Sequence, residues 1–194
     1  PFSKQEVDFL TKNIKVPFIK VASMDLNNYP FLEYIAKKKK PIVLSLGMGN
    51  LQEIDRAITT IEATNNFNII LLHCISIYPV PKNKVNLARI QTLQKMYPYP
   101  VGYSDHSIGE HVSQAAVALG AGLIEKHFTL DKDMEGWDHK ISANPYEMHS
   151  LIKKCNDIHA AIGSTRIYRI ENERRVNEFR RSIVAARDIK KGEK

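Results

Sequence analysis

The chain has 194 residues, of which 43% are hydrophobic and 25% charged, and its formal net charge is +7. This composition is typical of a globular chain large enough to bury a core, and neither a run of 18 apolar residues nor a signal-peptide pattern occurs. Lysines and arginines are spread along the chain, which argues against a nucleic-acid-binding protein.

Five short segments are dense in Ile, Val and Leu instead of alternating with polar residues. Such runs are typical of strands that are covered on both faces of a parallel sheet. They are residues 17–23, 41–47, 68–74, 101–107 and 122–128. Their starts lie 21 to 33 residues apart, which is the length of one strand, one helix and two short loops. The pattern therefore predicts a repeated βα unit.

Helical patterns occupy the intervals between these strands. Ser3, Asn50 and Asn144 each precede a glutamate by three residues, which is the arrangement of a helix capping box. Further helices are expected at residues 29–39, 86–95 and 110–119.

A repeated βα unit fits either a doubly wound sheet or a (β/α) barrel. Polar residues near the carboxyl ends of the predicted strands favour a barrel, because a barrel gathers these ends around one mouth. They are Lys20, Ser23, Ser45, His73, Ser76, Ser104, Asp105, His106, Glu125 and His127. Since a closed barrel needs eight strands, we expect an α/β fold of the TIM-barrel type, here a partial barrel over residues 1–163.

The composition changes after residue 163. Residues 164–178 are rich in Arg, Glu and Asn and predict a helix and linker that leave the barrel. Residues 179–194 predict an extended segment that opens a further, truncated domain. Because the chain starts at Pro1 and has only five predicted strands, we expect a fragment of a longer protein.

The two cysteines, Cys74 and Cys155, belong to no Cys-x-x-Cys pair and have no zinc-like spacing. We expect packing thiols without a redox function, and a reducing, cytoplasmic setting.

Lys20 lies in an otherwise apolar strand, where burying an unpaired ammonium would be costly. Its counter-ion could be a structural carboxylate, or the phosphate or carboxylate of a ligand that Ser23 and Ser45 also contact. A third alternative makes Lys20 the Schiff-base lysine of a class I aldolase.

His106 and His127 end successive predicted strands, so their imidazoles can meet over the mouth of a barrel. Two histidines with a substrate oxygen or water suit a divalent transition ion, and the alternative is a pair of structural, hydrogen-bonded histidines. The neighbouring Asp105 and Glu125 could orient ligands, bind sugar hydroxyls or transfer protons, or could pair with a basic residue such as Lys126.

The chain carries a series of short motifs in a fixed order. They are Lys20-Val-Ala-Ser23, Ser45-Leu-Gly-Met48, Leu72-His-Cys74 with Tyr78-Pro79, Asn86-Leu87, Gly102-Tyr-Ser-Asp-His106, Leu119-Gly-Ala121, Glu125-Lys-His-Phe-Thr-Leu-Asp131 and Arg180-Arg-Ser182. In this order and at these spacings they resemble the sialic acid synthase family, which includes the legionaminic and pseudaminic acid synthases.

The resemblance implies a transferase that condenses phosphoenolpyruvate with N-acetylmannosamine or a related 2,4-diacetamido hexose. The products would be a nine-carbon 2-keto sugar acid and phosphate. His106 and His127 would bind a divalent ion, Mn²⁺ or else Mg²⁺ or Co²⁺, that acts as a Lewis acid, and together with Glu125 they are the implied catalytic residues. The residues implied to bind phosphoenolpyruvate are Lys20, Ser23, Ser45, Ser76 and Ser104. The residues implied on the sugar side are Tyr78, Glu125, Asp138 and Phe179.

Two features depart from the family pattern. Ser76 lies in an unusual Cys-Ile-Ser-Ile-Tyr run, where some family members have Asn. The Gly136-Trp-Asp-His139 run lies in a long loop, which is either a binding element or a surface turn, and Ala143-Asn-Pro145 follows where neuraminic acid synthases have Leu-Glu-Pro. The resemblance therefore does not determine which amino sugar is the acceptor.

The resemblance further implies a homodimer of the full-length protein, in which an antifreeze-like domain beyond this chain caps the partner's site. This chain alone would then be inactive. The alternatives are the class I aldolase and a truncated barrel that serves only as an assembly module. No nucleic-acid or membrane partner is expected.

Overall fold

A computed structural model describes residues 1–193, which form two compact units. The first unit comprises residues 1–162, and the second begins at Gly163. The first unit holds a single parallel sheet. Its strands are β1 (Ile19–Val21), β2 (Ile42–Ser45), β3 (Ile69–Cys74), β4 (Val101–Asp105) and β5 (Ile124–Lys126). All five predicted strands are confirmed, and each is shorter than the apolar run that predicted it.

Six α-helices accompany the sheet. They are α1 (Lys4–Phe9), α2 (Tyr29–Ala36), α3 (Leu51–Glu62), α4 (Ala88–Met96), α5 (His111–Ala118) and α6 (Pro145–Ile162). A π-helical stretch, Leu10–Ile14, continues α1, and short 3₁₀ turns cover Ser23–Asp25 and Lys82–Lys84.

The three predicted helix caps are confirmed. The Ser3 hydroxyl accepts a hydrogen bond from the Glu6 amide at 3.2 Å. Asn50 begins α3 with a reciprocal capping box, and Asn144 begins α6 in the same way. Each cap satisfies backbone N–H groups that the first turn of a helix leaves without partners.

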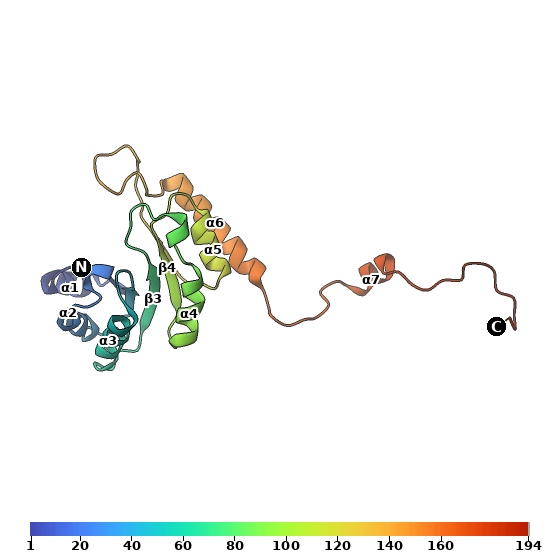
Figure 1. Cartoon of the computed structure of the whole chain (residues 1–194), viewed down its shortest axis with the longest axis horizontal. Coiled ribbons are helices and arrows are strands. Elements are labelled where there is room, and N and C mark those ends of the chain that lie inside the picture. The colour runs from blue at the N-terminus through green and yellow to red at the C-terminus, as the bar shows by residue number, and fades with distance from the viewer. Residues whose placement is uncertain (194) are drawn as a thin grey trace. The chain divides into compact units, whose positions relative to one another are not determined.

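The strand order distinguishes between the two expected architectures. Each strand pairs with the next one in the chain, in the order β1-β2-β3-β4-β5, and all pairs are parallel. A doubly wound sheet would reverse its order at a switch point, whereas a barrel advances in one direction. The first unit is therefore a curled partial barrel of the TIM-barrel type, as predicted, with helices beside its strands (Figure 1).

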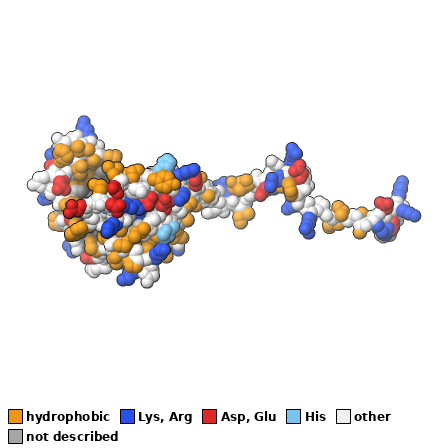
Figure 2. All heavy atoms as spheres, turned by 90° about the horizontal axis from the view of Figure 1, so that it is seen from above, with side chains coloured by type: hydrophobic (Ala, Val, Ile, Leu, Met, Phe, Trp, Pro, Cys, Tyr) orange, Lys and Arg blue, Asp and Glu red, His pale blue; other side chains and the backbone are white. Residues whose placement is uncertain are grey.

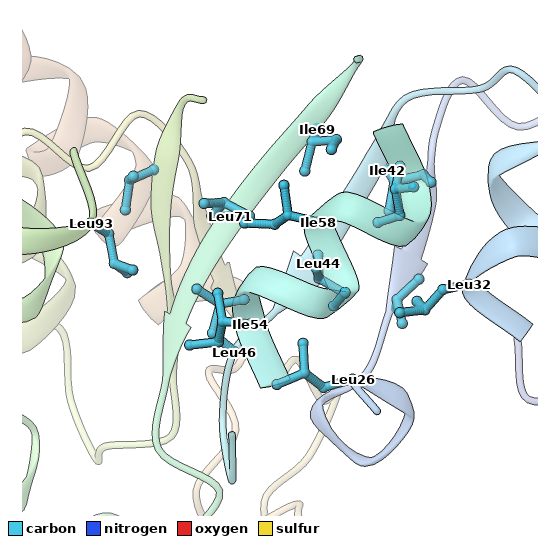
Figure 3. Packing of buried hydrophobic residues seen from close by; sticks show 14 of the residues in the cluster. Leu26, Leu32, Ile42, Leu44, Leu46, Ile54, Ile58, Ile69, Leu71 and Leu93 are labelled. Carbon is cyan, nitrogen blue, oxygen red and sulfur yellow. The ribbon is translucent and has the colours of Figure 1, made fainter. Parts of the chain in front are cut away.

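The main core lies between the sheet and its helices. Figure 3 shows Ile54 and Ile58 of α3 pointing toward Leu44 and Leu71 of the sheet. Alternate residues of β1 to β4 belong to this core, whereas Lys20, with the residues that share its face, points to the opposite side. The sheet thus has one face that packs against helices and one that is free to form a site.

The second unit contains one short helix, α7 (Glu173–Phe179), which Asn172 caps by accepting from the Arg175 amide at 2.9 Å. Residues 164–178, predicted to form a helix and linker, contain neither helix nor strand up to Asn172 and then form most of α7. Phe179, expected to start an extended segment, is the last residue of α7. Residues 180–193 contain neither helix nor strand, and Lys194 lies outside the described residues.

The surface shows no concentration of charge on the face displayed in Figure 2, where basic and acidic side chains of the first unit are interspersed. Within residues 1–193, no helix is both long and apolar enough to cross a membrane.

Leu71 is fully buried between the sheet and α3 and gives a test of this core. We expect Leu71→Ala to lower the free energy of unfolding by about 2–5 kcal/mol, because it removes a buried side chain and leaves a cavity. The matched control is Leu51→Ala, at a side chain that is 52% exposed, and it should change stability by about 0.5 kcal/mol or less. Urea denaturation of the intact protein measures both, and equal losses would contradict this account of the core.

The two outer strands give a second test. In the described part of the chain, β1 and β5 each pair on one side only. Free strand edges favour pairing with another chain, so residues 1–194 produced alone should self-associate. Sedimentation velocity measures this, and a monodisperse monomer would refute the expectation.

Candidate active site

A cavity of about 430 Å³ lies at the carboxyl ends of the strands. It is lined by Phe2, Lys20, Ala22, Ser23, Met24, Ser45, Met48, Cys74, Ser76, Tyr78, Ser104, His106, Glu125 and His127. All five strands or the segments that directly follow them contribute to this lining. The structure therefore brings together every residue predicted to bind phosphoenolpyruvate and both predicted metal ligands.

Lys20 and Glu125 form the charged part of the cavity. The Lys20 ammonium donates to the Val21 carbonyl at 3.1 Å and lies 3.5 Å from Glu125 Oε1. The Ser104 hydroxyl donates to the same carboxylate oxygen at 2.8 Å. Glu125 thus supplies the structural carboxylate that was one alternative for Lys20. Because both side chains are more than a quarter exposed, this ion pair contributes little stability and leaves the ammonium accessible from the cavity.

A cluster of hydroxyl and thiol groups surrounds Gly47, directly after β2. A Cβ atom at Gly47 would lie 2.6 Å from the hydroxyl oxygens of both Ser23 and Ser76, and 3.2 Å from the Cys74 sulfur. The Ser23 hydroxyl donates to that sulfur at 3.6 Å. Only glycine allows these groups to converge, and the result is a small polar cradle beside Lys20.

The two histidine rings lie close together in the same cavity, in an edge-to-face arrangement. Their ring centroids are 5.3 Å apart. His106 Nδ1 lies 2.8 Å from the Ile75 carbonyl oxygen, which can only accept, so Nδ1 carries the proton and Nε2 keeps its lone pair. Burial lowers the pKa of His106 and favours the neutral imidazole that a metal ion requires. His127 Nδ1 lies 3.6 Å from Asp138 Oδ2.

This donor set fits a divalent ion. Metal-binding histidines commonly donate their second ring nitrogen to a carbonyl or carboxylate, as His106 does to Ile75. No group of three or more His, Cys, Asp and Glu side chains in residues 1–193 is placed to hold an ion. The described residues thus offer an ion the two imidazoles as a pair, with no third ligand of these four types.

Tyr78 and Asp138 lie beside the histidines, on the predicted sugar side. The Tyr78 ring centroid is 4.1 Å from that of His106, and burial raises the pKa of the phenol. Asp138 contacts His127 from the loop after β5, in which Trp137 is 99% exposed. Phe179 belongs to the second unit and stays a prediction.

Two strand-end residues lie outside the cavity. The His73 ring is buried, and its Nε2 lies 2.7 Å from the Val85 carbonyl oxygen. Asp105 forms a buried ion pair with Lys126, which was the structural alternative at this position. Side chains alternate between the two faces of a strand, so both residues point toward the helices and away from the cavity.

Sequence reasoning missed the roles of Gly47 and Cys74. Cys74 was expected to be a packing thiol, and it is buried but also lines the cavity. The only signal for Gly47 was its place in the Ser45-Leu-Gly-Met48 motif.

Residues 1–167 match the NeuB family. The chain belongs to the NeuB family. It is 45% identical over 196 residues to N,N'-diacetyllegionaminic acid synthase of Campylobacter jejuni, covering all of this chain and 58% of that protein. It is 40% identical over 188 residues to N-acetylneuraminate-9-phosphate synthase of Homo sapiens, covering 96% of this chain and 52% of that protein.

A solved structure supports this family membership. The crystal structure of N-acetylneuraminic acid synthetase from Leptospira borgpetersenii, in complex with citrate, is 37% identical to this NeuB chain with a TM-score of 0.82. The match covers 92% of this chain and 61% of that one. This chain thus spans a little over half the length of the curated relatives that it matches.

Gly47→Ala tests whether the polar cradle binds the expected anion. The added Cβ must displace Ser23 and Ser76, so we expect phosphoenolpyruvate affinity to fall about tenfold or more, the cost of one hydrogen bond to a charged group. Gly122→Ala is the control, because its Cβ would meet nothing closer than 3.9 Å. Calorimetry on the intact protein measures both, and unchanged affinity in Gly47→Ala would show that the cradle does not hold the anion.

Proposed function

We propose that this chain provides the donor-binding and metal-binding part of a nonulosonic acid synthase. The reaction joins phosphoenolpyruvate to an N-acylated amino sugar and releases phosphate. One observation carries the proposal: a single cavity at the strand ends holds a lysine, the polar cradle and two adjacent histidines. Relatives named as legionaminic and neuraminic acid synthases support it.

The cradle side of the cavity suits a doubly anionic donor. Lys20 supplies a positive charge, and Ser23 and Ser76 converge beside it with hydroxyl donors. Ser45 and Ser104 line the same cavity and add further hydroxyls. Phosphoenolpyruvate carries a phosphate and a carboxylate, and hydrogen bonds to such charged groups are stronger than those to neutral ones.

The histidine side of the cavity suits the aldehyde of the acceptor. His106 would contribute Nε2 to a divalent ion, for which we propose Mn²⁺, while the Ile75 carbonyl holds the ring in orientation. When bound, the ion supplies Lewis acidity to the carbonyl oxygen of the open-chain sugar. Tyr78 and Asp138 flank the histidines and would contact the sugar hydroxyls.

Glu125 lines the same cavity as the cradle and the histidines. It accepts from Ser104 and lies near Lys20, and we propose that its carboxylate lies where donor and acceptor meet. We assign to it the orientation of the acceptor and proton transfer to or from a sugar oxygen.

In the proposed reaction, C3 of phosphoenolpyruvate bonds to the aldehyde carbon as the C2–C3 and C–O π bonds break, and the aldehyde oxygen takes a proton. A water oxygen then bonds to C2 and loses a proton. The C2–O bond to the phosphate group breaks, which releases phosphate and leaves a ketone at C2. The product is a nine-carbon 2-keto sugar acid.

The acceptor that we propose is N-acetylmannosamine or a related 2,4-diacetamido hexose. The relatives are named as synthases of different acids, so we include both kinds of acceptor sugar in the proposal. We also propose a homodimer as the active form of the intact protein.

The first test is Mn²⁺ titration of the intact protein by calorimetry. His106→Ala and His127→Ala should each weaken binding by more than about 100-fold, since even the groups that orient metal ligands cost about 10–100-fold when removed. The control is His149→Ala, at an exposed histidine of α6. With Mn²⁺ and phosphoenolpyruvate, the wild type should release phosphate only when an N-acylated amino sugar is added.

Two results would contradict this function. Mn²⁺ binding that is unchanged by both histidine substitutions would show that the ion does not bind at His106 and His127. Borohydride trapping of pyruvate on Lys20 would indicate a Schiff-base aldolase instead.

A further inference from the structure

Directly behind the two histidines, on the face of the sheet that packs against helices, lies a buried ion pair. Lys126 Nζ is 3.0 Å from Asp105 Oδ2, and the two side chains are 3% and 0% exposed. Every other ion pair among residues 1–193 joins side chains that are at least 18% exposed. The pair is therefore the one place where the described chain buries two opposite charges completely.

Each charge of this pair has further hydrogen bonds. Asp105 accepts from the Ser107 amide at 2.7 Å and from the Ser113 hydroxyl of α5 at 2.6 Å. Lys126 also donates to the Ser107 carbonyl at 2.7 Å. Although burial favours the neutral carboxyl, the charge of Lys126 and these hydrogen bonds hold the pKa of Asp105 below its ordinary value. The group ties β4, β5 and α5 together at fixed distances.

The register of the sheet places this pair one residue before the histidines. Asp105 lies opposite Lys126 in the pairing of β4 with β5, and His106 and His127 directly follow the last residues of these strands. Because side chains alternate in a strand, the ion pair points toward α5 while both imidazoles point into the cavity. The two ring positions are thus carried by backbone segments that the ion pair joins.

The preceding residues of the same two strands, Ser104 and Glu125, form a second cross-strand contact on the cavity side. Ser104 lies opposite Glu125 and donates to it at 2.8 Å. Two successive cross-strand contacts, one on each face, therefore precede the histidines. A small relative slip of the strand ends would change the separation of the rings, and metal sites lose affinity when their supporting residues are loose.

We infer that Asp105 and Lys126 are positioning residues that set the separation of His106 and His127 for one divalent ion. The inference rests on the proposed function for the ion itself. Replacing a buried ion pair by uncharged residues is often neutral in stability, so stability alone does not account for a charged pair at this position. Its directional contacts specify a distance between two strands, which apolar packing specifies less well.

The decisive variant is the double substitution Asp105→Asn with Lys126→Met in the intact protein. It leaves no single buried charge. The amide oxygen can still accept from the Ser107 N–H, and the amide nitrogen can donate to the Ser113 hydroxyl oxygen. We expect a folded protein whose Mn²⁺ affinity, measured by calorimetry, is lower by about tenfold or more. A crystal structure of the metal-free variant should show a ring separation different from 5.3 Å. The matched control is Glu147→Gln with Lys132→Met, which removes an ion pair of 2.6 Å at two partly exposed side chains.

Ser113→Ala is the second variant, and it decides the matter if the double variant does not fold. It removes one hydrogen bond to Asp105 and keeps both charges, so Mn²⁺ affinity should fall by a smaller factor, about threefold. Wild-type affinity in either folded variant, with an unchanged ring separation, would overturn the inference. If the wild-type protein binds no Mn²⁺, the proposed metal fails, and the ring separation in the metal-free variants then decides the positioning role by itself.

Discussion

The whole site depends on the parallel register of five neighbouring strands. Parallel pairing puts all the carboxyl ends at one edge of the sheet, and the strictly sequential order gathers them around one cavity. Lys20 on the first strand and Glu125 on the last are 105 positions apart in the chain, yet their charged atoms lie 3.5 Å apart. Curling of the sheet is what brings these two ends together.

Because side chains alternate along each strand, one face of the sheet packs against the helices and the other lines the site. The helix-facing residues, such as Leu44 and Leu71, supply the burial that holds the sheet to α3. Residues on the opposite face do not pack against the helices, so charged and hydroxyl side chains can occupy it near the strand ends. Near the ends of β4 and β5 the two roles meet, because Asp105 and Lys126 are buried among the helices while the next residues carry the imidazoles.

Much of this arrangement could be predicted from the sequence. The five dense apolar runs marked the strands, and the glutamate three residues after Ser3, Asn50 and Asn144 marked three helix starts. The sequence did not predict which of two adjacent strand residues points into the cavity, because a shift of one residue moves a side chain to the other face of the sheet. His73 and Asp105 were both expected at the mouth because they lie near strand ends, and both face the helices. The role of Gly47 depends on contacts between three separate strand ends, which no local pattern encodes.

The measurement that tests the account most directly is a crystal structure of the intact protein soaked with Mn²⁺ and phosphoenolpyruvate. We predict anomalous density for one ion bound by both His106 and His127, with the phosphate or carboxylate of the donor contacting Lys20 and the serines of the polar cradle. An ion bound elsewhere, or a donor that leaves Lys20 paired only with Glu125, would contradict this prediction.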